Sequence, residues 1–207
     1  ACQWMEEKKT FDWQSRKEEL KQLRDKYRKS NGFDCVVPVS GGKDGTYVIY
    51  TLKNKYGLHP LAVTIRPALE TELGKQNLNN FVHSGFNHMH ITPDINILRK
   101  LNKLGFIKKG FPYYGWLITI HSAVIRLAVN LNIPLLFYGE DGEIEYGGST
   151  ESKNRALVDI NYMKKIYLEG GYEKILNQVD ESEADLFFWR FPSEEELEGK
   201  ELYCTHM

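Results

Sequence analysis

Residues 33–44 read FDCVVPVSGGKD, a short apolar run followed by two glycines, a lysine and an aspartate. The run from Phe33 to Ser40 is almost continuous in apolar residues and contains β-branched ones, as in a parallel strand that is covered on both faces. After Asp44, apolar residues recur at helical spacing until Gly57 ends the pattern. This stretch therefore predicts a buried strand that turns through a glycine loop into a helix.

The same alternation of strand and helix recurs along the chain. Further strands are predicted at 59–66, 87–92 and 134–138, and helices at 12–30, 70–83, 113–131 and 157–179, the last with a break at its two glycines. No internal repeat is visible. We therefore expect an α/β fold, an open parallel sheet of the Rossmann-like kind with helices on both faces and right-handed crossovers.

The length and composition are those of one ordinary folded domain. The chain has 207 residues, of which 42% are hydrophobic and 27% are charged. Within it we expect an N-terminal helical segment over 1–30, a main domain over 31–192 and an acidic, weakly patterned tail over 193–207.

The charge and cysteine content exclude several classes of function. The formal charge is −1 and no broad basic surface is evident, so nucleic acid is an unlikely partner. The three cysteines, Cys2, Cys35 and Cys204, give no disulfide framework and favour a reducing, cytoplasmic location. No apolar run approaches the ~20 residues of a membrane helix, so no membrane association is expected.

The glycine loop has the chemistry of a phosphate site. Two glycines after a buried strand allow a sharp turn and bring N–H groups close to an anion, which the following helix N-terminus also attracts. Ser40 could add a hydroxyl, Lys43 a positive charge, and Asp44 a ligand for Mg²⁺. The alternative is a plain turn in which Ser40 or Asp44 caps the helix. Neither a Walker A loop nor a Gly-x-Gly-x-x-Gly motif is present, which argues against P-loop kinases and Rossmann dehydrogenases.

Ser40 to Asp44 resembles the SGGxD[S/T] PP-loop of the N-type ATP pyrophosphatases, which have the adenine nucleotide alpha hydrolase-like fold and cleave ATP to AMP and pyrophosphate. The resemblance implies that Ser40, Gly41, Gly42, Lys43 and Asp44 cradle the pyrophosphate, and that Asp44 and Lys43 are catalytic. One position departs from the pattern: Gly45 replaces the usual Ser or Thr, and Thr46 follows it. Both are retained as candidate nucleotide contacts.

The same resemblance places adenine at the end of the second predicted strand. Val63, Thr64 and Ile65 would meet the base through backbone and apolar side chains. The alternative is that these residues only form the sheet core.

A second candidate region follows the predicted strand at 134–138. Residues 139–149 read GEDGEIEYGGS, an acidic, glycine-rich stretch at the carboxyl end of a strand, where α/β sheets bind ligands. We expect Gly139 to contact the nucleotide, Glu140 to act in catalysis and hold Mg²⁺, and Glu140 and Asp141 to bind substrate. The alternative is a solvated acidic loop.

Residues 60–82 (PLAVTIRPALETELGKQNLNNFV) and 135–149 (LLFYGEDGEIEYGGS) resemble the N-acetyl sugar amidotransferases of bacterial surface-glycan biosynthesis, of the lipopolysaccharide and pseudaminic-acid type. The resemblance covers nearly the whole chain. It implies adenylation of an acetamido oxygen on a nucleotide-linked sugar, followed by attack of ammonia to give an acetamidino sugar, AMP and pyrophosphate.

The resemblance also has implications for partners and for the ends of the chain. Ammonia would come from a separate glutaminase subunit, because the chain is too short to contain a glutaminase domain, and a homo-oligomer stays an open alternative. Relatives commonly begin with a cysteine-rich zinc-binding segment, of which Ala1-Cys2 resembles the last part, and they continue beyond Met207. We therefore expect the chain to be a trimmed fragment.

The remaining candidates have two interpretations each. Arg66 and Arg126 could bind substrate phosphates or form structural ion pairs. His88 and His90 would share a strand face, but two ligands without a third do not define a metal site, and His121 is expected in the core. Alternative functions are a tRNA-modifying PP-loop enzyme of the thiolation or lysidine type, and a non-catalytic adenine-nucleotide-binding module.

Overall fold

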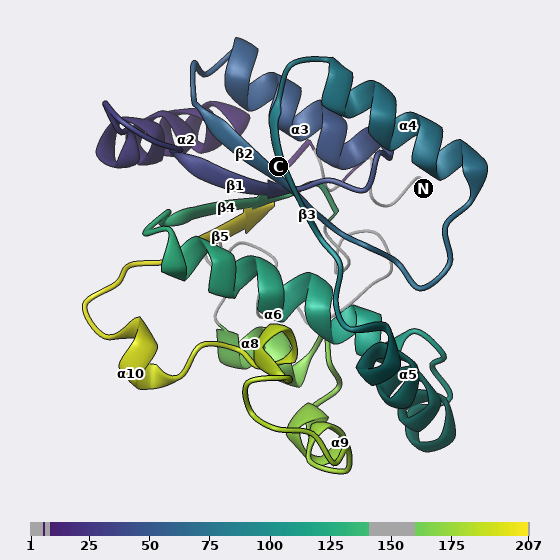
Figure 1. The fold of residues 1–207 in the computed structure, drawn as a ribbon. Coiled ribbons are helices and arrows are strands. Elements are labelled where there is room, and N and C mark those ends of the chain that lie inside the picture. Colours follow the sequence, from purple (N-terminus) through teal and green to yellow (C-terminus); the bar gives the residue numbers. More distant parts are fainter. Residues whose placement is uncertain (1–5, 7–8, 141–159, 207) are drawn as a thin grey trace.

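A parallel sheet of five strands forms the centre of the computed structural model, which describes residue 6, residues 9–140 and residues 160–206 (Figure 1). The strands of this described part are β1 (Cys35–Pro38), β2 (Pro60–Ile65), β3 (Asn87–Ile91), β4 (Leu135–Tyr138) and β5 (Tyr203–His206). The helices are α2 (Trp13–Tyr27), α3 (Lys43–Asn54), α4 (Glu72–His83), α5 (Ile95–Lys109), α6 (Tyr114–Asn130), α8 (Ile160–Lys165), α9 (Tyr172–Leu176), the 3₁₀ turn η1 (Phe187–Trp189) and α10 (Glu194–Leu197). The expected α/β fold is confirmed.

The strand order places β1 at the centre of the sheet. The order is β3-β2-β1-β4-β5, and every neighbouring pair is parallel. Val36 of β1 lies opposite Leu61 of β2 on one side and Leu136 of β4 on the other. After β3 the chain crosses to the far side of β1, so the loops that follow β1 and β4 are neighbours at the carboxyl edge of the sheet.

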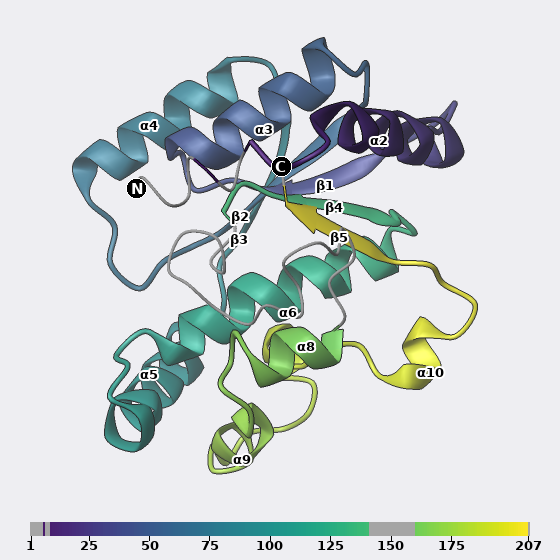
Figure 2. The same cartoon turned by 180° about the vertical axis from the view of Figure 1, so that it is seen from behind.

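The residues of β1 are apolar in succession because helices cover both faces of the sheet. Cys35 and Val37 point to the side of α3, α4 and α2, while Val36 points to the side of α5 and α6, and all three are fully buried. The two helical layers are visible above and below the sheet in Figure 1 and from behind in Figure 2. This two-sided burial accounts for the continuous apolar run.

Helices α5 and α10 and strand β5 were not expected from the sequence. The N-cap residue of α5 is Asp94, whose side chain accepts a hydrogen bond from Asn96 N. Its C-cap residue is Gly110, in the left-handed region with φ of 71°. The segment expected to be a weakly patterned tail supplies α10 and β5, and Cys204 of β5 pairs with Leu136. A strand of four residues among acidic neighbours carries too little pattern to be recognised, because its partner β4 is what makes it a strand.

The predicted helix at 157–179 is interrupted in the part that the structure describes. Helix α8 ends at Lys165 and α9 begins at Tyr172, and the two glycines between them, Gly170 and Gly171, both have φ of 65°. Glycine adopts this backbone conformation without the steric cost that other residues have, so the break falls where it was predicted.

Arg126 holds the C-terminal segment against α6. It is buried, and its guanidinium donates to the carbonyls of Arg190 and Phe191 at 3.0 Å each and to Glu196 at 2.6 Å. The backbone N–H of Ser193 and, to a lesser degree, the Arg126 guanidinium hold the pKa of Glu196 below its usual value. This network fixes the path of the chain between η1 and β5.

In the described ranges, no helix has both the length and the apolar character required to cross a lipid bilayer.

We expect the substitution Arg126→Met to lower the free energy of unfolding by about 2 kcal/mol, because the carbonyls and the carboxylate lose a charged hydrogen-bond donor. Urea denaturation followed by circular dichroism measures the change. Arg99→Met, at an exposed position of α5, is the matched control and should change stability by less than about 0.5 kcal/mol. Equal effects of the two substitutions would contradict the role given to Arg126.

Candidate functional site

The candidate site lies at the carboxyl edge of the sheet, where the ends of β1 and β4 meet the start of α3. A β-carbon added to Gly139, just after β4, would lie 2.6 Å from the Gly45 nitrogen and 2.7 Å from the Asp44 carbonyl carbon. A β-carbon added to Gly45 would lie 2.6 Å from the Pro38 carbonyl oxygen. Three backbone segments therefore touch at this point with no room for a side chain.

This contact explains the departure of Gly45 from the PP-loop pattern. A Ser or Thr at this position would drive its β-carbon into the Pro38 carbonyl in this structure, so only glycine fits. The nearest following hydroxyl belongs to Thr46, which is half-buried in the first turn of α3.

Helix α4 bounds the glycine loop on a second side. The helix itself was predicted at 70–83, but its contact with the loop was not. Gly41 has φ of 82°, and a β-carbon on it would lie 2.9 Å from the backbone nitrogen of Leu78. The first glycine of the loop thus allows both the turn and the close approach of the α4 backbone. The double glycine signals such an approach, but the sequence does not identify the partner.

The N-terminus of α3 has no side-chain cap. Its N-cap residue is Gly42, whereas α4 is capped by Thr71 and α5 by Asp94. The first N–H groups of α6, from Gly115 and Trp116, are satisfied by the side chain of Asn102 at 2.9 and 3.4 Å. Helix α3 thus differs from α4 and α5 in that its own N-cap residue supplies no side-chain acceptor for its first N–H groups.

The charged residues of the loop lie at the same place. Lys43 Nζ lies 2.6 Å from Asp44 Oδ1, with the lysine side chain 89% exposed and that of the aspartate 37% exposed. Ser40 Oγ accepts from the N–H of Gly42 at 3.3 Å, which folds the loop back on itself. The loop therefore presents one cation, one carboxylate and the start of α3 to solvent.

Asp44 and Glu140 are the carboxylates at this edge that could hold Mg²⁺ together with a nucleotide. Glu140 is exposed and follows Gly139, so its backbone departs from beside Asp44. No cluster of three or more His, Cys, Asp or Glu side chains arranged for a metal is found in the described residues. Two carboxylates suit Mg²⁺ because phosphate oxygens and water complete its ligands in nucleotide sites. Asp141 lies outside the described residues.

The predicted adenine contacts lie inside the sheet. Val63, Thr64 and Ile65 are 1%, 4% and 6% exposed, respectively. The Val63 carbonyl accepts from the N–H of Val39 at 2.9 Å, and the Ile65 carbonyl accepts from Trp116 Nε1 at 3.4 Å. The structure thus places these residues at the edge of the site but uses several of their polar groups for packing.

The two arginine candidates are separated from each other. Arg66 follows β2 at the carboxyl edge, where its Nη2 lies 2.9 Å from Glu70. Arg126 lies in the second half of α6, which runs opposite to the strands, and its three guanidinium nitrogens bond the C-terminal segment instead. The structure does not bring Arg126 to the loop, and the interpretation as an ion pair is the one its contacts support.

The histidines have separate surroundings. His88 and His90 lie on β3 with ring centroids 5.9 Å apart, and His88 Nε2 is 2.8 Å from the Thr64 hydroxyl. Burial, followed by the neighbouring His90, lowers the pKa of His88. His121 stacks on Tyr167 with ring centroids 5.3 Å apart.

The cysteines described in the structure are not suited to nucleophilic chemistry. Cys35 and Cys204 are fully buried, and burial raises the pKa of both thiols, that of Cys204 to about 12. A reactive cysteine needs an accessible thiol with a lowered pKa. Cys2 lies outside the described residues.

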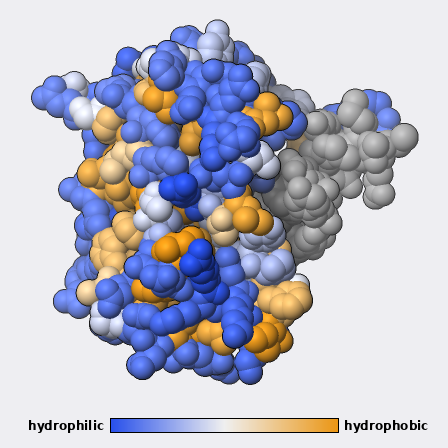
Figure 3. All heavy atoms as spheres, turned by 45° about the vertical axis from the view of Figure 1, so that its right-hand side comes forward, coloured by the Kyte–Doolittle hydropathy of each residue, from blue (hydrophilic) through white to orange (hydrophobic). Residues whose placement is uncertain are grey.

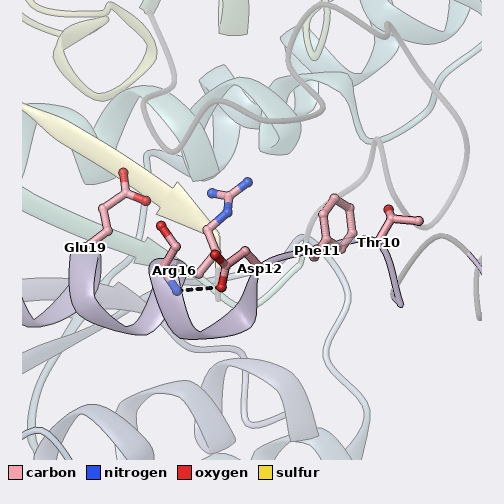
Figure 4. Close-up of a pocket in the computed structure, with 6 residues that line it drawn as sticks. Thr10, Phe11, Asp12, Arg16 and Glu19 are labelled. Atoms are coloured by element: carbon pink, nitrogen blue, oxygen red, sulfur yellow. Dashed lines mark hydrogen bonds between the residues drawn. The ribbon is translucent and has the colours of Figure 1, made fainter.

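A shallow pocket of about 380 Å³ lies apart from the loop, at the start of α2 (Figure 4). It is lined by Thr10, Phe11, Asp12, Ser15, Arg16 and Glu19. Asp12 is engaged in capping α2, since its carboxylate accepts from Ser15 N at 2.9 Å. None of the lining residues comes from the glycine loop or from the end of β4.

The face seen in Figure 3 is largely hydrophilic, with small separate hydrophobic groups.

Comparisons with known proteins show little close similarity. No protein-family model matches the chain, and no curated protein matches it. A solved structure described as a predicted subunit of tRNA methyltransferase from Methanocaldococcus jannaschii is similar over 71% of this chain and 74% of its own, with 20% identity and a TM-score of 0.42. The fold assignment therefore depends on the sheet order of this chain.

We expect Gly45→Ala and Gly139→Ala each to lower the free energy of unfolding by about 1 to 3 kcal/mol, because the added methyl groups meet backbone atoms that cannot move aside easily. Gly42→Ala is the matched control in the same loop. Gly42 has φ of −76°, and the nearest atom to its added β-carbon is the side-chain oxygen of Ser40. Urea denaturation of the three variants compares them, and a stable Gly45→Ala protein would disprove the close contact.

Proposed function

We propose that the chain is an ATP-dependent synthetase subunit of the N-type ATP pyrophosphatase superfamily. The supporting observation is the Ser40–Asp44 loop at the switch point of a parallel sheet, where two glycines and a lysine lead directly into α3. The alternative interpretation of this motif is a plain turn without a ligand. The combination of glycines, a lysine and a helix N-terminus at the carboxyl edge suits a pyrophosphate group.

Each loop residue has a role in this proposal. The loop N–H groups, the Ser40 hydroxyl and the Lys43 ammonium hold the β- and γ-phosphates of ATP, and Asp44 and Glu140 hold Mg²⁺. When bound, Mg²⁺ neutralises charge on the phosphates as pyrophosphate departs. Because the donors are fixed before the reaction, they stabilise the developing negative charge without reorganisation.

The acceptor we propose is the acetamido oxygen of a nucleotide-linked N-acetyl sugar. This oxygen attacks the α-phosphorus of ATP, and pyrophosphate leaves. Ammonia from a separate glutaminase then attacks the activated carbon, and AMP departs with the former amide oxygen to leave an acetamidino group. Support for this choice comes from the resemblance of residues 60–82 and 135–149 to the N-acetyl sugar amidotransferases.

The burial of Cys35 and Cys204 favours this acceptor over tRNA thiolation. Thiolation enzymes of the superfamily often use pairs of catalytic cysteines, and the two cysteines in the described structure are inaccessible and have raised pKa values. The formal charge of −1 also gives the chain no net attraction to RNA.

We expect repeated turnover of ATP to AMP and pyrophosphate only when Mg²⁺, a nucleotide-linked N-acetyl sugar and ammonium are all present. A coupled pyrophosphate assay, with mass spectrometry of the sugar product, measures this dependence. Added ammonium takes the place of the ammonia that the glutaminase would supply, so the test does not require the glutaminase subunit. Pyrophosphate release at the same rate without sugar would refute the amidotransferase, and nucleotide binding without any cleavage would indicate a binding module.

We expect Asp44→Ala to lower turnover at least about 100-fold, because the Mg²⁺ and phosphate charges lose a fixed ligand. The fold should be intact, since within the described residues Asp44 pairs with an exposed lysine, and such surface pairs contribute little stability. Asp25→Ala, an exposed aspartate of α2 beside Arg24, is the control and should leave turnover unchanged. Thermal unfolding of both variants separates lost chemistry from lost structure.

A further inference from the structure

Thr64 lies in β2 directly beside the residue that precedes the glycine loop. Its hydroxyl donates a hydrogen bond to the carbonyl of Val39, and Ser40 is the next residue in the chain. Both side chains are buried, with Thr64 4% and Val39 3% exposed. The bond is therefore shielded from water, where a hydrogen bond contributes most to a fixed geometry.

Val39 is held on both of its backbone groups by consecutive residues of β2. Its N–H donates to the Val63 carbonyl at 2.9 Å, and its carbonyl accepts from the Thr64 side chain. Strand β1 ends at Pro38, so these two hydrogen bonds continue the pairing with β2 for one residue beyond the end of β1. The peptide bond that leads into Ser40 is thereby fixed in orientation.

A histidine on the neighbouring strand fixes the direction of the Thr64 hydroxyl. His88 Nε2 lies 2.8 Å from Thr64 Oγ1. Because the single hydroxyl hydrogen is directed at Val39, the oxygen must accept from His88, which requires the tautomer with hydrogen on Nε2. These hydrogen bonds thus connect His88 of β3 through Thr64 of β2 to Val39, the residue that follows β1 and precedes the loop.

We propose that Thr64 is a positioning residue of the PP-loop, which orients the loop N–H groups through the Val39 carbonyl. This inference rests on the proposed function in one respect, namely that the loop binds phosphates. A β-branched apolar residue would fill the same space in the sheet. Packing in the sheet therefore does not require a hydroxyl at position 64, whereas the hydrogen bond to the Val39 carbonyl before the loop does.

The test compares Thr64→Val, which keeps the shape and removes the donor, with Thr64→Ser, which keeps the donor. Hydrogen exchange of the amides of Val39 and Gly42, which donate to the Val63 carbonyl and the Ser40 hydroxyl, respectively, reports order at the start of the loop when it is measured without nucleotide. We expect Thr64→Val to accelerate exchange at these amides roughly tenfold or more, and Thr64→Ser to stay within about threefold of the parent protein. Pyrophosphate affinity should fall in parallel for Thr64→Val alone.

Thr119→Val is the matched control, because Thr119 is fully buried in α6 and its hydroxyl donates to the carbonyls of Gly115 and Trp116 of its own helix. It should leave loop exchange unchanged. Unchanged loop exchange in Thr64→Val, or equal acceleration in Thr64→Ser, overturns the proposal. If the parent protein binds neither ATP nor pyrophosphate, the proposed function fails, while the exchange data still decide the role of Thr64.

A second variant covers the case in which Thr64→Val does not fold. His88→Phe removes the donor that orients the hydroxyl from a half-buried edge position, without leaving a cavity in the core. We expect a smaller acceleration at the same amides. No acceleration in this variant then overturns the proposal.

Discussion

The contact of three backbone segments at the carboxyl edge is the constraint on which the candidate site depends. The end of β1, the first turn of α3 and the residue after β4 approach so closely that Gly45 and Gly139 have no space for a β-carbon. Two strands from distant parts of the sequence are thereby brought to one helix N-terminus. The glycine loop and the first residue after β4 touch because of this contact, whereas the strand order alone would only make them neighbours.

The sequence predicted the elements that carry strong local patterns. Strands β1 and β2 are buried on both faces, and their apolar runs reveal them, while the spacing of Val48, Ile49 and Leu52 predicts α3. Strand β5 was missed because its four residues become a strand only through pairing with β4. Helix α5 was left unassigned, although Asp94 and Gly110 mark its two ends. Local signals existed for α5 and were absent for β5.

The candidate site shows the same limit in its side chains. The SGGKD motif predicted the position of the loop, because the residues that shape the turn and carry its charges are consecutive in the sequence. The wall formed by Leu78, the capping of α6 by Asn102 and the bond from Thr64 to Val39 depend on pairs far apart in the chain. Arg126 illustrates the reverse case. Its position in an apolar helix suggested a functional charge, but the direction of α6 and the contacts to the C-terminal segment determine its surroundings.

The pairing of β5 with β4 has a consequence for how the protein forms during synthesis. Until residues 203–206 leave the ribosome, β4 is an edge strand whose outer hydrogen-bonding groups have no partner, although β1 already pairs with its inner side. A buried apolar edge that waits for a distant partner is prone to pair with other chains. Arg126, which draws residues 190–196 onto α6, shortens the search that β5 must complete. Contacts of residues 190–196 with α6 would therefore favour pairing of β5 with β4 over pairing of β4 with another chain.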